Sequence, residues 1–526
     1  MNARSTRSSA VIVVAAAIAG WLLAMPGKAE ETQEPVFPPE ESVLPVEPDL
    51  EEPAGADPLG QLPNELPPLR GVDAATEAPT PEEGIEIPPA PPAFVAPADA
   101  DVPPSPSAED LAVPQSPLQI RISRTQGLSL DDALQLALDN NPDIELARLA
   151  VESLFEAVRE VRAEYTPQVS SQAQYTISRP SELRGVNNDL LSMSLRASYV
   201  FFDGGGRNAR NRVADSNLEI ARDQLALTTQ SVRLSVAESY YSLQLADAQV
   251  QIAEAAIANS EANLRDTEAQ FRAGIGTRFE VLQAETELAT DRQDLLRAEN
   301  DQLLARRRLA ELLNFDSPTD AIATDAIEPT QAWEQSLEDT ILAAFQNREE
   351  LEIQRDAFAR AQQQAQLALA ARRPRIEGFV DYEVSNVFSE PLARVGFVDG
   401  YSVGFTISWL AIDGGATDAR ARQADIDALD AIRTFERDRN DIRRSVEDAF
   451  LSLSSNREQI EVAQLAISTA RESLRLARLR FQAGVGTQTD VISQQTALTQ
   501  ARANLADAVI GYNLAIVQLE RAVSSL

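Results

Sequence analysis

The sequence predicts a mostly α-helical protein in which one unit, made of long coiled-coil helices and two β-hairpin strands, occurs twice. Three observations predict this fold class. Motifs of the first half recur in the second half at a nearly constant offset, apolar residues recur every seven positions along two uninterrupted stretches, and four short stretches alternate between apolar and polar residues. A period of two is typical of strands, whereas a period of seven is typical of packed helices.

The duplication is visible at both ends of the unit. Ser129–Asp132 matches Ser336–Asp339 at an offset of 207 residues. Phe271–Thr277 matches Phe481–Thr487 at an offset of 210, with five identities in seven positions. The three-residue change falls between the strands, where insertions are tolerated. Agreement of this length indicates an internal repeat, which divides the chain into two parts, 121–330 and 331–526.

Helices account for most of each repeat. We expect helical stretches at 129–164 and 336–372, each opened by a serine that can cap its N-terminus. Nothing breaks the helix between about 206 and 273, a length of roughly 100 Å at 1.5 Å per residue. A strict seven-residue stripe calls for helical neighbours along its whole length. The stripe and its copy consist of Val236, Leu243, Val250, Ile257 and Leu264, and of Val446, Leu453, Ile460, Ile467 and Leu474.

A Gly-x-Gly-Thr turn ends each long helix. Glycine supplies the positive φ that a chain needs after a helix end, and Thr277 and Thr487 can cap the next helix. These turns predict two tight helical hairpin tips. A phosphate-binding loop is the other interpretation of Gly-x-Gly, but no strand precedes these turns and no lysine follows them.

Each repeat also contains two predicted strands, at about 167–178 and 190–202 and at about 375–386 and 400–411. One face of each strand is apolar and the other is polar. The candidates for a polar, water-facing side are Gln172, Gln174, Arg196, Glu377, Asp381 and Glu383.

These strands have the length that crosses a bilayer at a tilt. An ordinary half-buried antiparallel sheet gives the same alternation. A secretory signal at the N-terminus, described below, and the lack of another element to pack on the apolar faces favour a membrane barrel. Four strands cannot close a barrel with a water-filled lumen, and an open edge in lipid would leave backbone groups unpaired. The chain must therefore oligomerise, and a trimer would supply 12 strands.

The N-terminal region is predicted to contain a secretory targeting signal. Residues 1–29 resemble a signal peptide, with Arg4 and Arg7 before an apolar run and small residues at the expected cleavage point. A retained anchor helix is the other interpretation, but the run is short for a membrane span. Residues 30–120 form a proline-rich, acidic segment that we expect to be a disordered tether; its first 89 residues (30–118) carry 20 Asp or Glu and one Arg. A docking segment for a partner is the alternative.

Composition excludes several functions. The chain has no Cys and no His, so it cannot form a disulfide framework, a thiolate nucleophile or a typical zinc site. Its net charge of −35 argues against nucleic acid as a partner. Carboxylates are plentiful, but none forms a motif that differs from helix surface charge. We therefore expect no enzyme activity and no cofactor.

Taken together, these features resemble the TolC family of outer-membrane efflux proteins. The resemblance rests on the opening Leu128–Pro142, on the two strand–Asp-Gly-Gly–helix junctions and on the paired Phe-x-Ala-Gly-x-Gly-Thr tips, and it covers about 125–526. It implies a homotrimer whose 12-strand barrel is continued by a 12-helix periplasmic barrel. It also implies docking to a periplasmic adaptor (a membrane fusion protein) and an inner-membrane transporter through the tips. The corresponding positions are Phe271, Gly274, Gly276, Thr277, Phe481, Gly484, Gly486 and Thr487.

The resemblance also implies a closed entrance ringed by aspartates just past the second tip. Asp490 stands at the first such position, but the next is Ser493, and the first repeat has Glu280 where the second has Asp490. Gly486 occupies the place of an arginine that latches the closed state in some members. A second interpretation of Asp490 is an acid at a helix start, where the helix dipole favours it.

The expected function is an outer-membrane exit duct with a long periplasmic extension. It would serve tripartite efflux, type I secretion or both, as a passive conduit opened at its tip by partner binding. The alternative is a periplasmic coiled-coil scaffold without a pore.

Overall fold

The computed structural model of the chain describes residues 113, 115–122, 124–178, 188–315, 318–387 and 397–524. All of them belong to one compact unit that begins at Pro104. The expected signal peptide and all but the last few residues of the expected tether lie outside the described residues. Within the end of the tether, α2 is a short helix at Pro117–Ile120.

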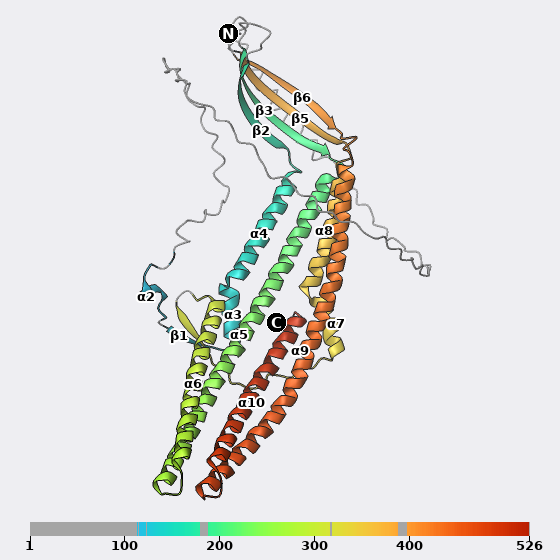
Figure 1. Cartoon of the computed structure of the whole chain (residues 1–526). Coiled ribbons are helices and arrows are strands. Elements are labelled where there is room, and N and C mark those ends of the chain that lie inside the picture. The colour runs from blue at the N-terminus through green and yellow to red at the C-terminus, as the bar shows by residue number, and fades with distance from the viewer. Residues whose placement is uncertain are drawn as a thin grey trace, which may run out of the picture. The chain divides into compact units, whose positions relative to one another are not determined.

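Apart from β1, which has no counterpart before α7, the two repeats contain the same elements in the same order (Figure 1). The first repeat consists of β1 (Arg124–Leu128), α3 (Leu130–Asn140), α4 (Pro142–Ala163), β2 (Gln168–Ser178), β3 (Asn188–Phe202), α5 (Gly206–Arg272) and α6 (Arg278–Leu313). After β4 (Thr319–Ala323), the second consists of α7 (Leu337–Asn347), α8 (Glu349–Ala370), β5 (Arg375–Val387), β6 (Val398–Ser408), α9 (Ala416–Gln482) and α10 (Gln488–Ala522). Both long helices, α5 and α9, have 67 residues. The prediction of a mostly helical chain with a few strands is confirmed.

Local sequence explains where the shorter helices begin. Ser129 and Asp132 form a complete capping box, with the Asp132 N–H donating to Ser129 Oγ at 3.2 Å. Asn141 caps α4, and Pro142 follows at the first helical position, where a missing N–H costs nothing. The stretch expected at 336–372 is helical apart from a break at Arg348, which the sequence analysis did not predict and which has no proline. The backbone of Arg348 is extended there, and its guanidinium donates to Glu350 Oε1 at 2.6 Å.

The long helices lie in a row in the order α6, α5, α10, α9, and among the described elements each packs extensively on the next (Figure 1). The shorter helices continue this row upward, because α4 meets the end of α6 and α8 meets the end of α10. Asn141 Nδ2 donates to Leu312 O at 3.1 Å in the first joint, and Asn347 Nδ2 donates to Val523 O at 3.3 Å in the second. Each pair of short helices thus runs alongside one continuous long helix.

The largest cores lie at the level of these joints. In the first repeat Val236, Tyr240 and Leu243 of α5 pack on Leu309 of α6 and on Ala133 of α3. In the second repeat α9 packs on α10 in the same way, through residues that include Val446, Tyr512 and Leu519. None of the helices among the described residues combines the length and the apolar composition needed to cross a membrane.

A small parallel sheet of β1 and β4, which the sequence analysis did not predict, fastens the segment between the repeats to α5. The Tyr240 hydroxyl lies 2.8 Å from Asp325 Oδ2 and 3.1 Å from Leu128 O. The same carboxylate oxygen accepts the Leu130 N–H at 2.8 Å, and Gln244 Nε2 donates to Asp325 O at 3.0 Å. We call these contacts the Tyr240 hub.

The remaining strands form one antiparallel sheet in the order β2-β3-β5-β6, so that the two hairpins meet at β3 and β5. Along β6, no described residue covers the apolar face: Val403, Phe405 and Ile407 are each more than 60% exposed. The last strand, expected to reach about 411, ends at Ser408, and the next residue, Trp409, donates its indole N–H to Arg372 O at 3.0 Å.

Candidate docking tips, entrance and bore lining

Two glycines of different function build each hairpin tip. In the first tip Gly274 has φ of 75°, which favours glycine, and in the second Gly484 has φ of 71°. Gly276 and Gly486 instead lie close to the preceding helix end. A Cβ on Gly486 would lie 3.0 Å from Phe481 N, and one on Gly276 would lie 3.1 Å from Phe271 N. The Gly-x-Gly spacing is therefore required by the turn itself.

The threonines of the motif begin the next helices. Thr277 Oγ1 accepts the Glu280 N–H at 3.3 Å, and Glu280 Oε2 accepts the Thr277 N–H at 2.7 Å. In the second tip Thr487 and Asp490 make the same reciprocal pair, with both distances at 3.1 Å. These capping boxes satisfy N–H groups that a helix start leaves without partners.

The two phenylalanines of the motif, equivalent in sequence, differ in burial. Phe481 is 3% exposed and packs with Leu474, Val491 and Leu498. Phe271 is 43% exposed. The difference arises because α5 covers the second tip: Gln270 Nε2 donates to Phe481 O at 3.0 Å. Phe481 therefore has a packing role within the chain, whereas Phe271 is open to a neighbour.

The largest exposed apolar groups of the tips were not among the predicted candidates. Ile275 and Val485, the middle residues of the two Gly-x-Gly turns, are 72% and 70% exposed, and Phe279 is 73% exposed. The signal was present in the sequence, because an apolar residue held between two turn glycines has no helix to pack on. Ile275 and Phe279, with Phe271, are thus exposed apolar groups of the first tip, and Val485 is one of the second.

The three predicted entrance residues lie at or near the helix starts that follow the tips. Glu280 and Asp490 occupy matching capping positions, and Ser493 is exposed on α10. The hydrogen bonds from Thr487 hold the pKa of Asp490 below its usual range. Asp490 is charged at neutral pH and caps the start of α10, as the second interpretation expects, and its place at the entrance stays a prediction.

The strand register brings all six predicted bore residues to one face of the sheet. Arg196 lies opposite Asp381, and Glu383 opposite Ser194, while Gln172, Gln174 and Glu377 follow from the same alternation. Phe379 also lies on this face, opposite Ser198, and the alternation pattern missed it. The Arg196 guanidinium carbon lies 4.4 Å from the centre of the Phe379 ring, a cation–π arrangement. Along β5 this face carries the carboxylates Glu377, Asp381 and Glu383, with Arg375 at the start of the strand.

Within the part of the chain that the structure describes, no group of three or more carboxylates is arranged to hold a metal ion.

Comparison with known proteins decides the family. The family model for outer membrane efflux proteins matches residues 133–314 and 340–524, one segment in each repeat. The chain belongs to this family. Its members are channels and not enzymes, and membership places this efflux protein in the outer membrane with a periplasmic extension. The predicted resemblance is confirmed, and membership disfavours the alternative of a periplasmic scaffold without a pore.

Individual relatives are distant. Outer membrane protein TolC of Vibrio cholerae is 23% identical over 76% of this chain and 91% of its own length. Protein CyaE of Bordetella pertussis is 24% identical over 48% of this chain, and the match spans only about half of CyaE, 54%. The crystal structure of CusC matches the fold with a TM-score of 0.66 and 20% identity, over 78% of this chain and 96% of that one.

Proposed function

We propose that three copies of this efflux protein form an exit duct through the outer membrane. Twelve strands close a membrane barrel, and twelve helices continue it as a periplasmic tunnel. The duct serves tripartite efflux, type I secretion or both as a passive conduit, and it opens when a periplasmic adaptor binds the tips.

The observation that carries the proposal is the pair of open ends in one protomer. The sheet ends at β2 and β6, and the helix row ends at α6 and α9. Strand edges in lipid require partners. The two outer helices expose more large apolar side chains than the surface of a soluble protein usually does. These are Leu296, Leu303 and Leu304 on α6, and Ile426, Leu429, Leu451, Val462 and Leu465 on α9. A second copy, with its α6 against α9, covers both.

The duplication predicts the contacts between copies. Because the helices of the two repeats correspond at an offset of 210, the packing of α5 on α10 within a chain should recur as the packing of α9 on α6 of the next chain. Within the chain Thr267 Oγ1 lies 3.1 Å from Gln488 Oε1. The corresponding pair between copies is Ala477 and Arg278.

Cross-linking tests this arrangement directly, since the chain has no Cys. The variant Ala477→Cys with Arg278→Cys, treated in membranes with a short thiol-specific cross-linker, should give dimers and trimers on denaturing gels. Thr267→Cys with Gln488→Cys is the matched control, and its cross-link should stay within one chain. Oligomers from the control alone, or none from the first pair while the control reacts, would refute the arrangement.

The polar sheet face supports a wet, cation-preferring bore. Glu377, Asp381 and Glu383 supply three carboxylates per chain to this face. Fixed charges of one sign raise the local concentration of counter-ions. Channels reconstituted in planar bilayers should therefore prefer cations, and Asp381→Asn with Glu383→Gln should reduce that preference. Anion-preferring wild-type channels would contradict the lumen assignment.

The exposed apolar surface of the tips supports adaptor docking there. Ile275 and Val485 project where no part of the described chain covers them. Replacing both with Ser should weaken binding of the adaptor, while the cross-link between copies persists.

A further inference from the structure

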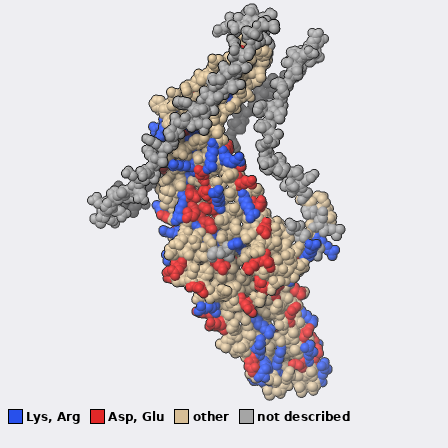
Figure 2. Space-filling view, turned by 180° about the vertical axis from the view of Figure 1, so that it is seen from behind, with Lys and Arg blue, Asp and Glu red and all other residues tan. Residues whose placement is uncertain are grey.

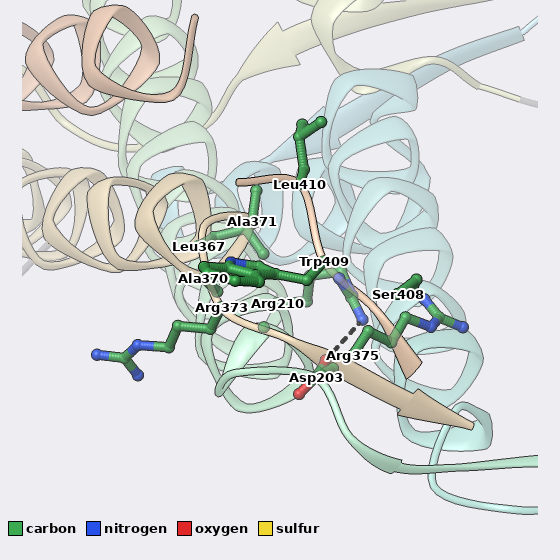
Figure 3. A pocket seen from close by; sticks show the side chains of 11 residues that line it. Asp203, Arg210, Leu367, Ala370, Ala371, Arg373, Arg375, Ser408, Trp409 and Leu410 are labelled. Atoms are coloured by element: carbon green, nitrogen blue, oxygen red, sulfur yellow. Dashed lines mark hydrogen bonds and ion pairs between the residues drawn. The ribbon is translucent and has the colours of Figure 1, made fainter. Parts of the chain in front are cut away.

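Two adjoining pockets lie where the sheet meets the helices. The first, which we call the junction pocket, has a volume of about 560 Å³ and lies between the start of α5, the end of α8 and the ends of β5 and β6 (Figure 3). The second has a volume of about 440 Å³ and lies at the base of β2 and β3. Arg210 and Arg375 line both pockets. Figure 2 shows basic residues gathered at this level, above a group of acidic residues.

The duplication shows that two of the three arginines lining the junction pocket are specific to the second repeat. At the offset of 207, Arg373 and Arg375 correspond to Thr166 and Gln168. Ala371 corresponds to Glu164, so the second repeat also lacks a carboxylate that the first has. Three positions have therefore changed in the direction of positive charge, although the backbone around them is the same.

The ion pairs leave part of this charge uncompensated. Arg210 is paired, at 2.7 Å from Glu164 and at 3.3 Å from Asp203. Arg375 makes one contact, Nη2 to Glu377 Oε2 at 3.3 Å, and half of its side chain is exposed. Arg373 donates to the Gly204 carbonyl at 2.8 Å and has no carboxylate within ion-pair distance among the described residues.

The neighbouring pocket contains a further donor without a hydrogen-bond partner. Arg207 lies near the rings of Tyr165 and Tyr199 and forms an ion pair with Asp203, Nε to Oδ2 at 4.0 Å. Its Nη1 donates to Glu164 O at 3.3 Å, while its buried Nε makes no hydrogen bond. A guanidinium presents paired donors that match the oxygens of a carboxylate or a phosphate. In a chain of net charge −35, this is a local reversal of sign.

We propose that the junction pocket binds the carboxylate or phosphate group of a solute in the bore. Arg373 and Arg375 would supply the charge, and Trp409, which lies across the end of α8, would contact the apolar part of the same solute. The proposal rests on the proposed function in one respect, because Arg375 lies on the polar sheet face that would line the bore. It adds an anion-holding site to a bore whose strands favour cations.

Trp409 itself can report on the site. The chain has three tryptophans, of which Trp21 lies in the expected signal peptide, so Trp333→Phe leaves Trp409 as the reporter in the processed chain. In the purified full-length protein in neutral detergent, iodide should quench Trp409 more strongly than caesium does. Arg373→Gln with Arg375→Gln should lower the iodide quenching constant about threefold, the effect of removing unit charges a few Å away in water. Quenching by neutral acrylamide should not change, which shows that the fold is intact.

Charge-conserving and distant variants sharpen the result. Arg373→Lys with Arg375→Lys should keep the iodide quenching of the parent. Arg433→Gln with Arg444→Gln removes two exposed arginines of α9 and should also leave it unchanged. Equal iodide constants in the parent and the Arg373→Gln, Arg375→Gln variant would overturn the proposal.

Binding is tested with inorganic pyrophosphate as the probe, at constant ionic strength. Pyrophosphate should protect Trp409 from iodide in the parent and not in the double glutamine variant. Protection by phosphatidylglycerol in the micelles, without protection by pyrophosphate, would instead assign the pocket to a lipid headgroup and would overturn the solute proposal. Conductance in planar bilayers is measured separately: its absence in the wild type would refute the duct, while the quenching result alone decides the pocket.

Discussion

The Tyr240 hub makes a sharp prediction about how the two repeats are held together. Tyr240 is completely buried, and its hydroxyl lies within hydrogen-bond distance of Leu128 O, Asp325 Oδ2 and the Asp325 N–H, the last at 3.3 Å. The substitution Tyr240→Phe removes one oxygen and leaves the ring in place. It therefore tests hydrogen bonding without opening a cavity.

The expected cost follows from the groups left behind. Without the hydroxyl, the Asp325 N–H loses its partner. The Leu128 carbonyl keeps the Thr324 N–H at 3.0 Å, and the Asp325 carboxylate keeps the Leu130 N–H. Leaving a buried polar group without a partner costs about 1–3 kcal/mol. Because 1.4 kcal/mol corresponds to a factor of ten, local opening of β1 and β4 should become about 5 to 150 times more frequent.

Hydrogen exchange followed by mass spectrometry measures this opening. Peptides covering 124–128 and 319–325 should exchange faster in the variant, whereas peptides at the tips should not change. Tyr241→Phe is the matched control, since Tyr241 is adjacent and nearly as buried, and its hydroxyl takes no part in the hub. Equal exchange in Tyr240→Phe and Tyr241→Phe would refute the reasoning.

Three further predictions concern Tyr241 and the second tip. Burial raises the pKa of Tyr241 to about 12. The stability that the buried neutral side chain contributes is therefore full below pH 10, the usual pKa of tyrosine, and is lost as the pH rises toward 12. In thermal melts followed by circular dichroism, Tyr241→Phe should reduce this loss of stability at high pH. Gly486→Ala and Gly484→Ala should both expose the tip to limited proteolysis, the first because its Cβ would lie 3.0 Å from Phe481 N and the second because alanine disfavours a φ of 71°. Thr487→Ala removes the cap of the Asp490 N–H and should cost about 1 kcal/mol, seen as faster exchange in the first turn of α10.

The elements with long, regular patterns could be predicted from the sequence. The mostly helical architecture follows from the heptad stripes, and the single polar face of the sheet follows from alternation that continues through Arg196 and Asp381. The Gly-x-Gly-Thr tips follow because positive φ and a threonine cap are requirements of the local backbone alone.

Features that depend on contacts between distant segments could not be predicted. The break at Arg348 contains neither proline nor glycine, so the local sequence gives no sign of it. Hydrogen bonds from Arg348 to Glu350 and to the end of α10 hold the backbone there. The different burial of Phe271 and Phe481 is invisible in two motifs that differ at two positions, because it is decided by which helix lies alongside. The Asp325 contacts join residues 85 and 195 positions apart.

The equal length of α5 and α9 has an evolutionary consequence. Each is a single helix of 67 residues that reaches from the sheet to a tip, so its residue number fixes the distance between these two levels. An insertion of one heptad in α5 alone would place its tip about 10 Å beyond that of α9. It would also shift α5 lengthwise relative to α4 and α6, which meet end to end beside it. The length of the periplasmic extension can therefore change only by matched insertions in both repeats. The two halves of the gene must evolve together in the length of this helix.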